Sequence, residues 1–567
     1  MTRTARRTRE TRKSRKLCCD HYPFGRLGDA SSTIARLTET PVAGTLERDS
    51  YATPRAMIHL RITPDLDFDV VIAGGGPAGA SAGARLASAG LRVAILDRQA
   101  FPRDKVCGDF VGPAALIELG ALGVAGYDGY AGSNVIRQAA LYLDGEELIR
   151  RPIPEVDGLP AYGRCIPRLT LDDWVLQAAR RAGATVMTAQ VSGFDVLASH
   201  VVVHAKQGGS SLELRAKLLI GADGSSSTVS RELRGGPPPD DDRIIAVRAY
   251  YEGDAGPEDQ ADLYFAGESF PGYYWLFPTG RGRANVGVGM VLETLPPTSD
   301  HLRELLLALV DGDPALRARL GRASITGKVV GWPLTTYNAR LPIVGDRVML
   351  VGDAAGFINP LNGEGIQYAL ISGRWAAECA VESISENDVS TAALQRYADR
   401  AEHELRYDMA LAGIIVQLIR NRHLNGVWLE ALKIISARAK VDREYAEIAG
   451  GILAGLVPAR DALTFRIVGR TVDQAAYSLA LQVLWTALKG PKHLGDRGVG
   501  LARSGAALGR QMMEDPAGVL DWLVGVVRHG GELAVQFGSH IGDRRNGATH
   551  GEPPALHEPA VRLRIPG

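Results

Sequence analysis

The chain has 567 residues, 46% of them hydrophobic, which is enough for two or three ordinary globular domains. Because 64 lysines and arginines balance 64 aspartates and glutamates, no net field draws the protein to nucleic acid or to an anionic membrane. The five cysteines show neither CxxC spacing nor the density of a disulfide scaffold, so they indicate no metal site and favour a reducing, cytoplasmic setting.

Residues 1–66 are predicted to form a disordered extension. The first sixteen residues carry eight basic side chains, and no strand or helix pattern appears before Leu66. An alternative is an extended start, with Met57 as the true initiator. Because no apolar run follows the arginines, the pattern does not indicate a secretory or twin-arginine signal.

A regular pattern begins at Asp67. Val70 to Ala73 form a short apolar run typical of a buried parallel strand, residues 77–89 are small and helical, and residues 92–96 give a second strand. This order predicts a βαβ unit, with which Rossmann-like domains begin.

The loop between the first strand and the helix carries the pattern GxGxxG. Its first glycine permits a tight turn, its second lets the backbone approach a pyrophosphate, and its third lets helix and strand pack closely. The phosphates would lie on the helix N-terminus, and the acidic residue that ends the second strand can accept both hydroxyls of an adenosine ribose. The nucleotide-binding residues expected from this unit are Gly74, Gly76, Pro77, Ala78, Gly79, Asp97 and Arg98.

Two later segments decide between FAD and NAD. Asp223 follows the apolar strand "KLLIGADG", and the pair Gly352 and Asp353 follows the strand "RVMLVGD", ahead of a helix that opens near Gly363. Together with the glycine loop, these residues resemble the FAD-dependent oxidoreductases of the para-hydroxybenzoate hydroxylase superfamily. The resemblance implies that Asp353 binds the ribityl chain of FAD.

The resemblance also implies that the helix after Asp353 points its N-terminus at the pyrimidine ring of the flavin. This is physically sensible, because reduced flavin carries negative charge that a helix N-terminus stabilises. The backbone expected there comes from Gly363, Glu364, Gly365 and Ile366. Arg168 precedes an amphipathic helix, where the superfamily uses an arginine for FAD; the alternative is a solvated arginine.

The source of electrons is expected to lie outside the chain. No second GxGxxG with strand context follows the first, so a dedicated nicotinamide domain is not indicated. NAD(P)H visiting the flavin, or a reduced protein donor, would then supply the electrons.

The substrate side is predicted in residues 236–333, where strand-like alternation replaces helical periodicity. There the stretch "YYWLFP", followed after eight residues by GxG, resembles the YxWxFP…GxG signature of geranylgeranyl reductases, flavoenzymes that saturate isoprenoid double bonds. The segments "KVCGD" and "GDAAGFINPLNGEGI" resemble the same family, from about Asp67 to Arg400. The substrate-binding residues expected are Tyr273, Trp275, Phe277, Pro278, Gly287 and Gly289.

Alternate aromatic residues on one strand face would line an apolar slot for a prenyl chain, although ordinary core packing favours the same residues. Cys107 is expected to face the flavin at the substrate end of this slot. A thiol is small, nearly apolar and a weak proton donor, so Cys107 either delivers the proton of alkene saturation or only packs there. Lys105 is expected beside the cofactor or in solvent.

The sequence therefore predicts an α/β protein. A Rossmann-like FAD-binding domain (67–235 and 334–401) carries an inserted β-rich, α+β substrate domain (236–333), followed by a helical C-terminal region (402–545) and a loose tail (546–567). We expect an FAD-dependent enzyme that saturates C=C bonds of an apolar, isoprenoid-like substrate.

Two rival functions share these motifs. Flavin-dependent monooxygenases and halogenases have the same fold, and Lys105 imitates a halogenase lysine, but "YYWLFP" matches the halogenase signature WxWxIP at only two positions. An electron-transfer flavoprotein would need a partner surface rather than an apolar slot.

One segment of the C-terminal region has an apolar face whose binding partner the sequence does not decide. Residues 516–538 have a broad apolar face around Leu520, Leu523, Val524 and Val527. This face either packs on the flavin domain or rests on a membrane, at its cytoplasmic side, where lipid substrates reside.

Overall fold

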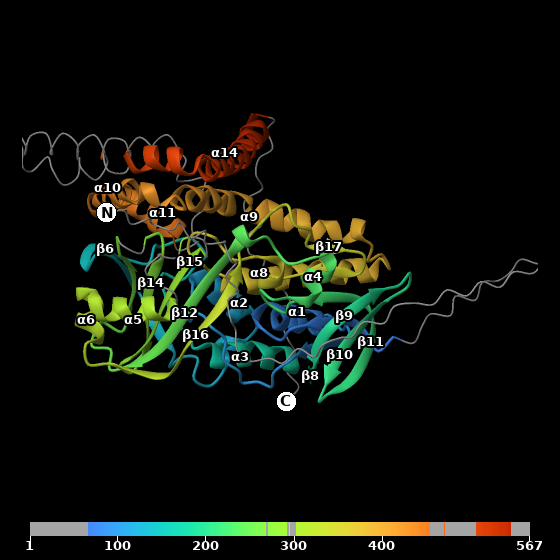
Figure 1. Ribbon diagram of the computed structural model, residues 1–567. Helices are drawn as coiled ribbons and strands as arrows, with labels where there is room; N and C mark the ends of the chain where they lie inside the picture. Colours follow the sequence, from blue (N-terminus) through green and yellow to red (C-terminus); the bar gives the residue numbers. More distant parts are fainter. Residues whose placement is uncertain are drawn as a thin grey trace, which may run out of the picture. The chain divides into compact units, whose positions relative to one another are not determined.

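The computed structural model describes residues 66–267, 270–291, 294, 302–453, 470, 474 and 506–545. The predicted N-terminal extension, except Leu66, and the predicted tail lie outside these residues, so both stay predictions. Within the described residues, two large sheets, a small sheet and a helical C-terminal part give the mixed α/β architecture expected from the sequence, which confirms the predicted fold class (Figure 1).

The first sheet is built around the predicted βαβ unit. Its strand order is β17-β18-β11-β1-β2-β8, and β10 and β9 extend it from β11. The strands are β1 (Phe68–Ala73), β2 (Val93–Asp97), β8 (Thr185–Thr188), β9 (Gln190–Val196), β10 (Val201–Gln207), β11 (Ser210–Gly221), β17 (Val344–Gly345) and β18 (Val348–Leu350). The central strands β18, β11, β1, β2 and β8 pair in parallel.

Helices cover the parallel strands, which explains why β1 and β2 read as continuous apolar runs. Residues Val70 to Ala73 of β1 are buried. The helices around this sheet are α1 (Pro77–Ser88), α2 (Pro113–Ala121), α3 (Arg168–Arg181), α4 (Thr228–Arg234), α7 (Gly352–Ala355) and α8 (Ile366–Ser385). A small sheet of β3 (Phe110–Val111), β7 (Gly163–Cys165) and β4 (Asn134–Ile136) follows the KVCGD segment.

The second large sheet has the order β16-β12-β15-β14-β13-β5-β6. Its strands are β5 (Gln138–Leu143), β6 (Glu146–Pro152), β12 (Arg243–Glu252), β13 (Gln260–Phe265), β14 (Tyr273–Gly280), β15 (Arg283–Val291) and β16 (Ser324–Thr335). Helices α5 (Leu302–Gly312) and α6 (Pro314–Leu320) pack into an apolar core with this sheet. Strands β5 and β6 join it from residues assigned by sequence to the cofactor domain, and the domain boundaries themselves stay a prediction.

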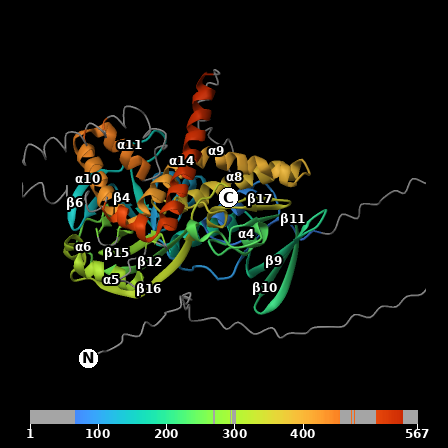
Figure 2. The same ribbon diagram turned by 45° about the horizontal axis from the view of Figure 1, so that its top comes forward.

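The C-terminal part is helical. It contains α9 (Thr391–Ile419), α10 (Asn425–Val441), α11 (Arg443–Leu453) and α14 (Pro516–Arg545). α14 packs on α9, where the Trp522 Nε1–H donates to the Gln417 carbonyl at 2.9 Å (Figures 1 and 2). α10 packs on β6, where Arg151 donates to the Ala439 carbonyl at 2.9 Å. Of the helices described, none combines the length and the apolar character needed to cross a bilayer.

In the glycine loop, the structure distinguishes a glycine needed for packing from a glycine that leaves room for a ligand. A Cβ added to Gly79 would overlap the Gly74 carbonyl, so this glycine is required where α1 packs on β1. A Cβ added to Gly76 would meet only the end of Arg103, at 3.4 Å, and Gly76 has an ordinary φ of −69°. The fold therefore tolerates a side chain at Gly76. If a substitution there abolishes ligand binding, the cause is contact with the ligand and not loss of the fold.

We expect Gly76→Val to abolish FAD binding while the unfolding temperature of the FAD-free protein stays nearly unchanged, because the new side chain enters the phosphate approach. Gly79→Val should lower that temperature sharply, because backbone must move. FAD absorbance after desalting and thermal unfolding by circular dichroism measure the two effects. Retention of FAD by the Gly76 variant would contradict the assignment of this loop.

Candidate active site

A cavity of about 1810 Å³ lies between the parallel sheet, the second sheet and the C-terminal helices. Its volume exceeds that of an ordinary small-molecule pocket, which is roughly 300–1,000 Å³. Most of the residues predicted for cofactor and substrate line this one space. They are Gly74, Gly76, Pro77, Ala78, Asp97, Arg98, Lys105, Cys107, Arg168, Asp223, Tyr273, Trp275, Phe277, Gly289, Asp353, Gly363, Glu364, Gly365 and Ile366.

Four predicted site residues lie outside the lining. Gly79 packs α1 on β1, and a Cβ on Gly352, which has φ +54°, would come within 2.8 Å of Ala78. A Cβ on Gly287 would overlap the indole ring of Trp275. Pro278 lies further along β14 and also stays out of the lining. At least three of these residues therefore make room for their neighbours, which is a packing role.

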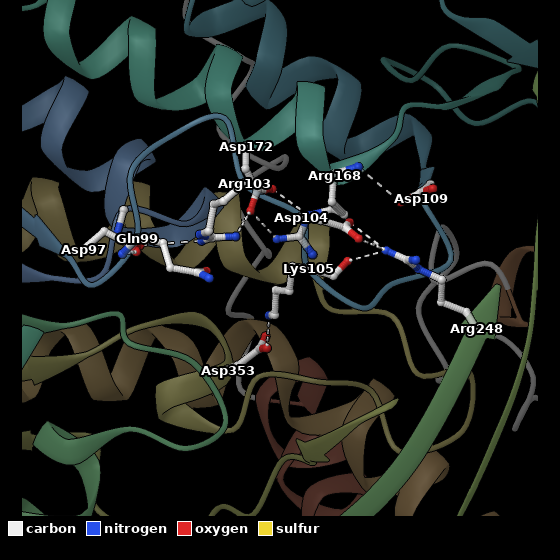
Figure 3. A network of polar contacts seen from close by, with 11 residues as sticks. Asp97, Gln99, Arg103, Asp104, Lys105, Asp109, Arg168, Asp172, Arg248 and Asp353 are labelled. Atoms are coloured by element: carbon white, nitrogen blue, oxygen red, sulfur yellow. Dashed lines mark hydrogen bonds and ion pairs between the residues drawn. The ribbon is translucent and has the colours of Figure 1, made fainter. Parts of the chain in front are cut away.

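At the end of the cavity lined by the glycine loop, Asp97 is hydrogen-bonded to that loop. Its Oδ2 accepts a hydrogen bond from the Gly75 backbone N–H at 2.9 Å, and its Oδ1 accepts one from the Gln99 N–H at 2.9 Å. Arg103 reaches the same carboxylate at 3.6 Å and also donates to Asp172 at 2.8 Å (Figure 3). Asp97 thus lies at the end of β2, where a ribose is expected.

Arg168 is buried, which overturns the alternative of a solvated arginine at a helix start. It is 3% exposed and forms two hydrogen bonds with Asp172, from Nε at 2.5 Å and from Nη2 at 2.7 Å. Burial opposes its charge, but Asp172 and then the neighbouring Cys107 side chain raise the pKa of the Arg168 guanidinium above its ordinary value. A fixed positive charge therefore lies beside the thiol.

Asp353 and Asp223 both line the cavity, but their carboxylates have different partners. Asp353 accepts a hydrogen bond from Lys105 Nζ at 2.7 Å, so Lys105 turns toward the cofactor region (Figure 3). Asp223 instead accepts hydrogen bonds from the Ser227 hydroxyl and from the Thr228 N–H, the latter at 2.7 Å. Asp223 therefore holds the turn that begins α4.

The residues present fit FAD. The N-terminus of α1 opens on the cavity at Gly76 and Pro77 with no side-chain cap, so free N–H groups face the space where a pyrophosphate would lie. The N-terminus of α8 opens on the same cavity at Gly365, also uncapped. Beside it, burial raises the pKa of Glu364 to about 8, which favours the protonated form of this side chain near neutral pH.

The aromatic residues of β14 form one wall at the other end. Ring centroids are 6.1 Å apart for Tyr273 and Trp275 and 6.4 Å apart for Trp275 and Phe277, and all three residues line the cavity. The Cys107 turn lies against this wall, because a Cβ on Gly108 would come within 2.9 Å of the Phe277 ring. The predicted slot and the predicted thiol therefore meet.

Several polar residues of the site were missed by sequence reasoning. Asp109 is buried at φ +65°, and burial raises its pKa to about 6. It accepts hydrogen bonds from Tyr250 Oη at 2.6 Å and Asn285 Nδ2 at 2.8 Å. Its place inside KVCGD was a usable signal. Asn285 carried none, since it lies in the spacer between the two substrate motifs. Also missed were Arg103, Asp104, Asp172 and Arg248, which pair across the site.

A family model described as an FAD binding domain matches residues 67–248. Digeranylgeranylglycerophospholipid reductase 1 of Methanopyrus kandleri is 34% identical over 374 residues, covering 64% of this chain and 93% of that protein. A menaquinone reductase of Mycobacterium tuberculosis is 35% identical over 335 residues, covering 55% of this chain and 76% of that one.

Solved structures of similar fold include a geranylgeranyl bacteriochlorophyll reductase-like protein from Thermoplasma acidophilum. Its TM-score is 0.55 at 24% identity, over 71% of this chain and 95% of that one. A flavin-dependent brominase has a TM-score of 0.58 at 20% identity, over 72% and 99%. At these identities the solved structures establish the fold alone.

We expect Asp353→Ala to weaken FAD retention about tenfold or more, because hydrogen bonds to a charged group are worth roughly 1.5–3 kcal/mol. Asp223→Ala should instead lower the unfolding temperature, because the turn before α4 loses its acceptor. Equilibrium dialysis of FAD at a temperature where both variants are folded separates the two effects. Equal losses of FAD would mean that the roles of the two aspartates are misassigned.

Proposed function

Because this chain belongs to the geranylgeranyl reductase family of FAD-dependent oxidoreductases, we propose that it saturates carbon–carbon double bonds of a prenyl chain. The observation that carries the proposal is the continuity of one cavity. The glycine loop of a nucleotide site lines one end, and the aromatic wall of β14 with Cys107 lines the other. A flavin and an apolar chain would meet there.

The C-terminal helices supply the rest of the slot. Leu411 and Ile415 of α9, Leu432 and Ile435 of α10, and Ile448 of α11 line the cavity beyond the aromatic wall. An apolar chain that lies there gains roughly 25 cal/mol for each Å² it removes from water. Because the lining at this end is mostly aliphatic and aromatic, it suits a long hydrocarbon better than a polar metabolite.

When bound and reduced by NAD(P)H or by a protein donor, FAD would supply the hydride for one alkene carbon. The other carbon needs a proton. We propose that Cys107 holds this proton at Sγ, because the thiol lies between the aromatic wall and the Arg168 guanidinium. The S–H bond breaks as the new C–H bond forms, and the thiolate that remains lies beside the Arg168 guanidinium. Water must then return the proton.

A halogenase remains the rival on this fold, since the brominase has a similar TM-score. Lys105 is the residue that would imitate a halogenase lysine. It is paired with Asp353 at 2.7 Å, on the side of the cofactor loop, and not with the aromatic wall. This pairing favours the reductase.

The proposed membrane contact rests on α14. Val519 and Trp522 face α9, whereas Leu520, Val524 and Val527 are 61%, 56% and 74% exposed. These positions recur every three or four residues, so they form an apolar stripe on the outer face of the helix. We propose that the stripe lies in a lipid surface, where a prenyl substrate would enter.

The reaction is tested with purified, dithionite-reduced protein and a prenyl lipid, by mass spectrometry of the product. We expect a gain of two hydrogens for each reduced bond. Trp275→Gln should raise KM about tenfold with FAD absorbance unchanged, because a polar group holds water in the slot. Cys107→Ala should lower kcat with little change in KM.

The matched control is Tyr142→Gln. Tyr142 stacks on Tyr264 in the same sheet, with ring centroids 4.8 Å apart, and it lies outside the cavity lining. This variant should lose stability and keep the wild-type KM. Absence of any reduced lipid from a panel of prenyl quinones and prenyl phospholipids would reject the proposed reaction, and loss of FAD from Trp275→Gln would place the slot elsewhere.

For the membrane contact, Val527→Asp should weaken binding to phosphatidylcholine–phosphatidylglycerol vesicles about tenfold, because a charge enters the apolar boundary. Val196→Asp is the control, since Val196 is also an exposed valine, at 43%, but lies on β9. Vesicle flotation measures both. Equal binding of the two variants would contradict the role of the stripe.

A further inference from the structure

We propose that Asn285 is a positioning residue that fixes Cys107 against Trp275, an inference that rests on the proposed function for the roles of thiol and indole. Asn285 lies on β15 and is fully buried. Its Nδ2 donates to the Cys107 carbonyl at 2.7 Å and to Asp109 Oδ2 at 2.8 Å. Its Oδ1 accepts from the Trp275 Nε1–H at 2.9 Å.

The amide of Asn285 can make these contacts in one orientation only. Turned over, its oxygen would face two acceptors, the Cys107 carbonyl and the Asp109 carboxylate, and its NH₂ would face the indole N–H. Both donors and one acceptor are in use, so all three contacts are made together. The side chain therefore links the thiol loop to the aromatic wall as a single unit.

The loop that carries Cys107 needs such a link. Asp109 adopts φ +65°, a left-handed conformation that costs energy for a residue with a side chain. Gly108 packs directly against the Phe277 ring. A movement of the turn away from the rings would lose this contact. Without Asn285, Asp109 would keep its bond from Tyr250, but the Cys107 carbonyl and the Trp275 indole would each lose a hydrogen bond.

If Asn285 only stabilised the core, its substitution would change stability alone. The test therefore measures the reactivity of the Cys107 thiol. Asn285→Asp keeps the size of the side chain and the acceptor for Trp275, but it removes the NH₂ group that donates to the Cys107 carbonyl and to Asp109, and it places a second carboxyl group against Asp109. The matched control is Asn134→Asp. Asn134 Nδ2 also donates to two carbonyls, those of Glu258 and Pro278, both at 2.7 Å, and Asn134 lies outside the cavity lining.

The rate at which iodoacetamide alkylates Cys107 is measured on the full-length, FAD-free protein, with peptide mass spectrometry to assign the site. We expect Asn285→Asp to alkylate about tenfold faster than wild type, because the loop opens more often once two hydrogen bonds are lost. Asn134→Asp should keep the wild-type rate at Cys107. An unchanged rate in Asn285→Asp would overturn the inference.

Kinetics give a second readout. Asn285→Asp should lower kcat about tenfold in the wild-type background and have no further effect on kcat in Cys107→Ala, because no thiol is left to position. Equal losses in both backgrounds would overturn the inference. If Asn285→Asp does not fold, Trp275→Phe removes the N–H that holds Asn285 and should also speed alkylation of Cys107; an unchanged rate there would count equally against it.

The two proposals fail in different ways. Alkylation needs no substrate, so faster labelling of Cys107 together with no reduction of any prenyl lipid would reject the proposed reaction and leave the positioning role intact. Reduction of a prenyl lipid with unaltered labelling would do the reverse.

Discussion

The pairing of the charged residues of segment 103–109 with buried partners is the constraint on which the rest of the site depends. Asp172 is fully buried and is held by Arg168 and Arg103 (Figure 3). Against the effect of burial, these arginines keep the pKa of Asp172 below its ordinary value. Arg248, 2% exposed, meets Asp104 at 2.5 Å. Because an unpaired charge in a dry interior costs several kcal/mol, the buried Asp172 and Arg248 favour the conformation in which the segment supplies their partners.

This segment joins the two sheets, so its pairing also sets how the two ends of the cavity meet. Arg103 reaches Asp97, at the end of β2, whereas Asp104 reaches Arg248 on β12 of the second sheet. Between them, Lys105 reaches Asp353 at the start of α7. A shift of one sheet against the other would break at least one of these pairs. These pairs tie the nucleotide loop to the second sheet, and such ties reduce the ordering needed when a ligand binds.

The parts that were predictable from sequence are those with a local signal. The glycine loop, the apolar run of β1 and the alternating aromatic residues of β14 each follow from a period or a turn requirement within a few residues. Asn285 had no such signal, because its three partners come from residues 107, 109 and 275, and only the fold brings them together. The same holds for Arg248 and Asp104, which are 144 positions apart. The apolar lining from α9 to α11 was not predicted, because many different aliphatic sequences can line a cavity and none of them forms a recognisable motif.

The aromatic residues of β14 and Gly287 of β15 depend on each other. The residues predicted to bind substrate therefore divide into those that line the cavity and those that make room for the lining. Tyr273, Trp275 and Phe277 present rings to the cavity, whereas Gly287 leaves the space that the Trp275 indole occupies over β15. Tyr273 Oη in turn donates to the Asn362 carbonyl at 2.6 Å, on the loop that leads into α8. The wall of the slot is thus tied to the N-terminus of the helix that faces the cofactor region. A glycine that never touches substrate can then be as necessary as a ring that does, because the ring reaches its place only where a side chain is missing.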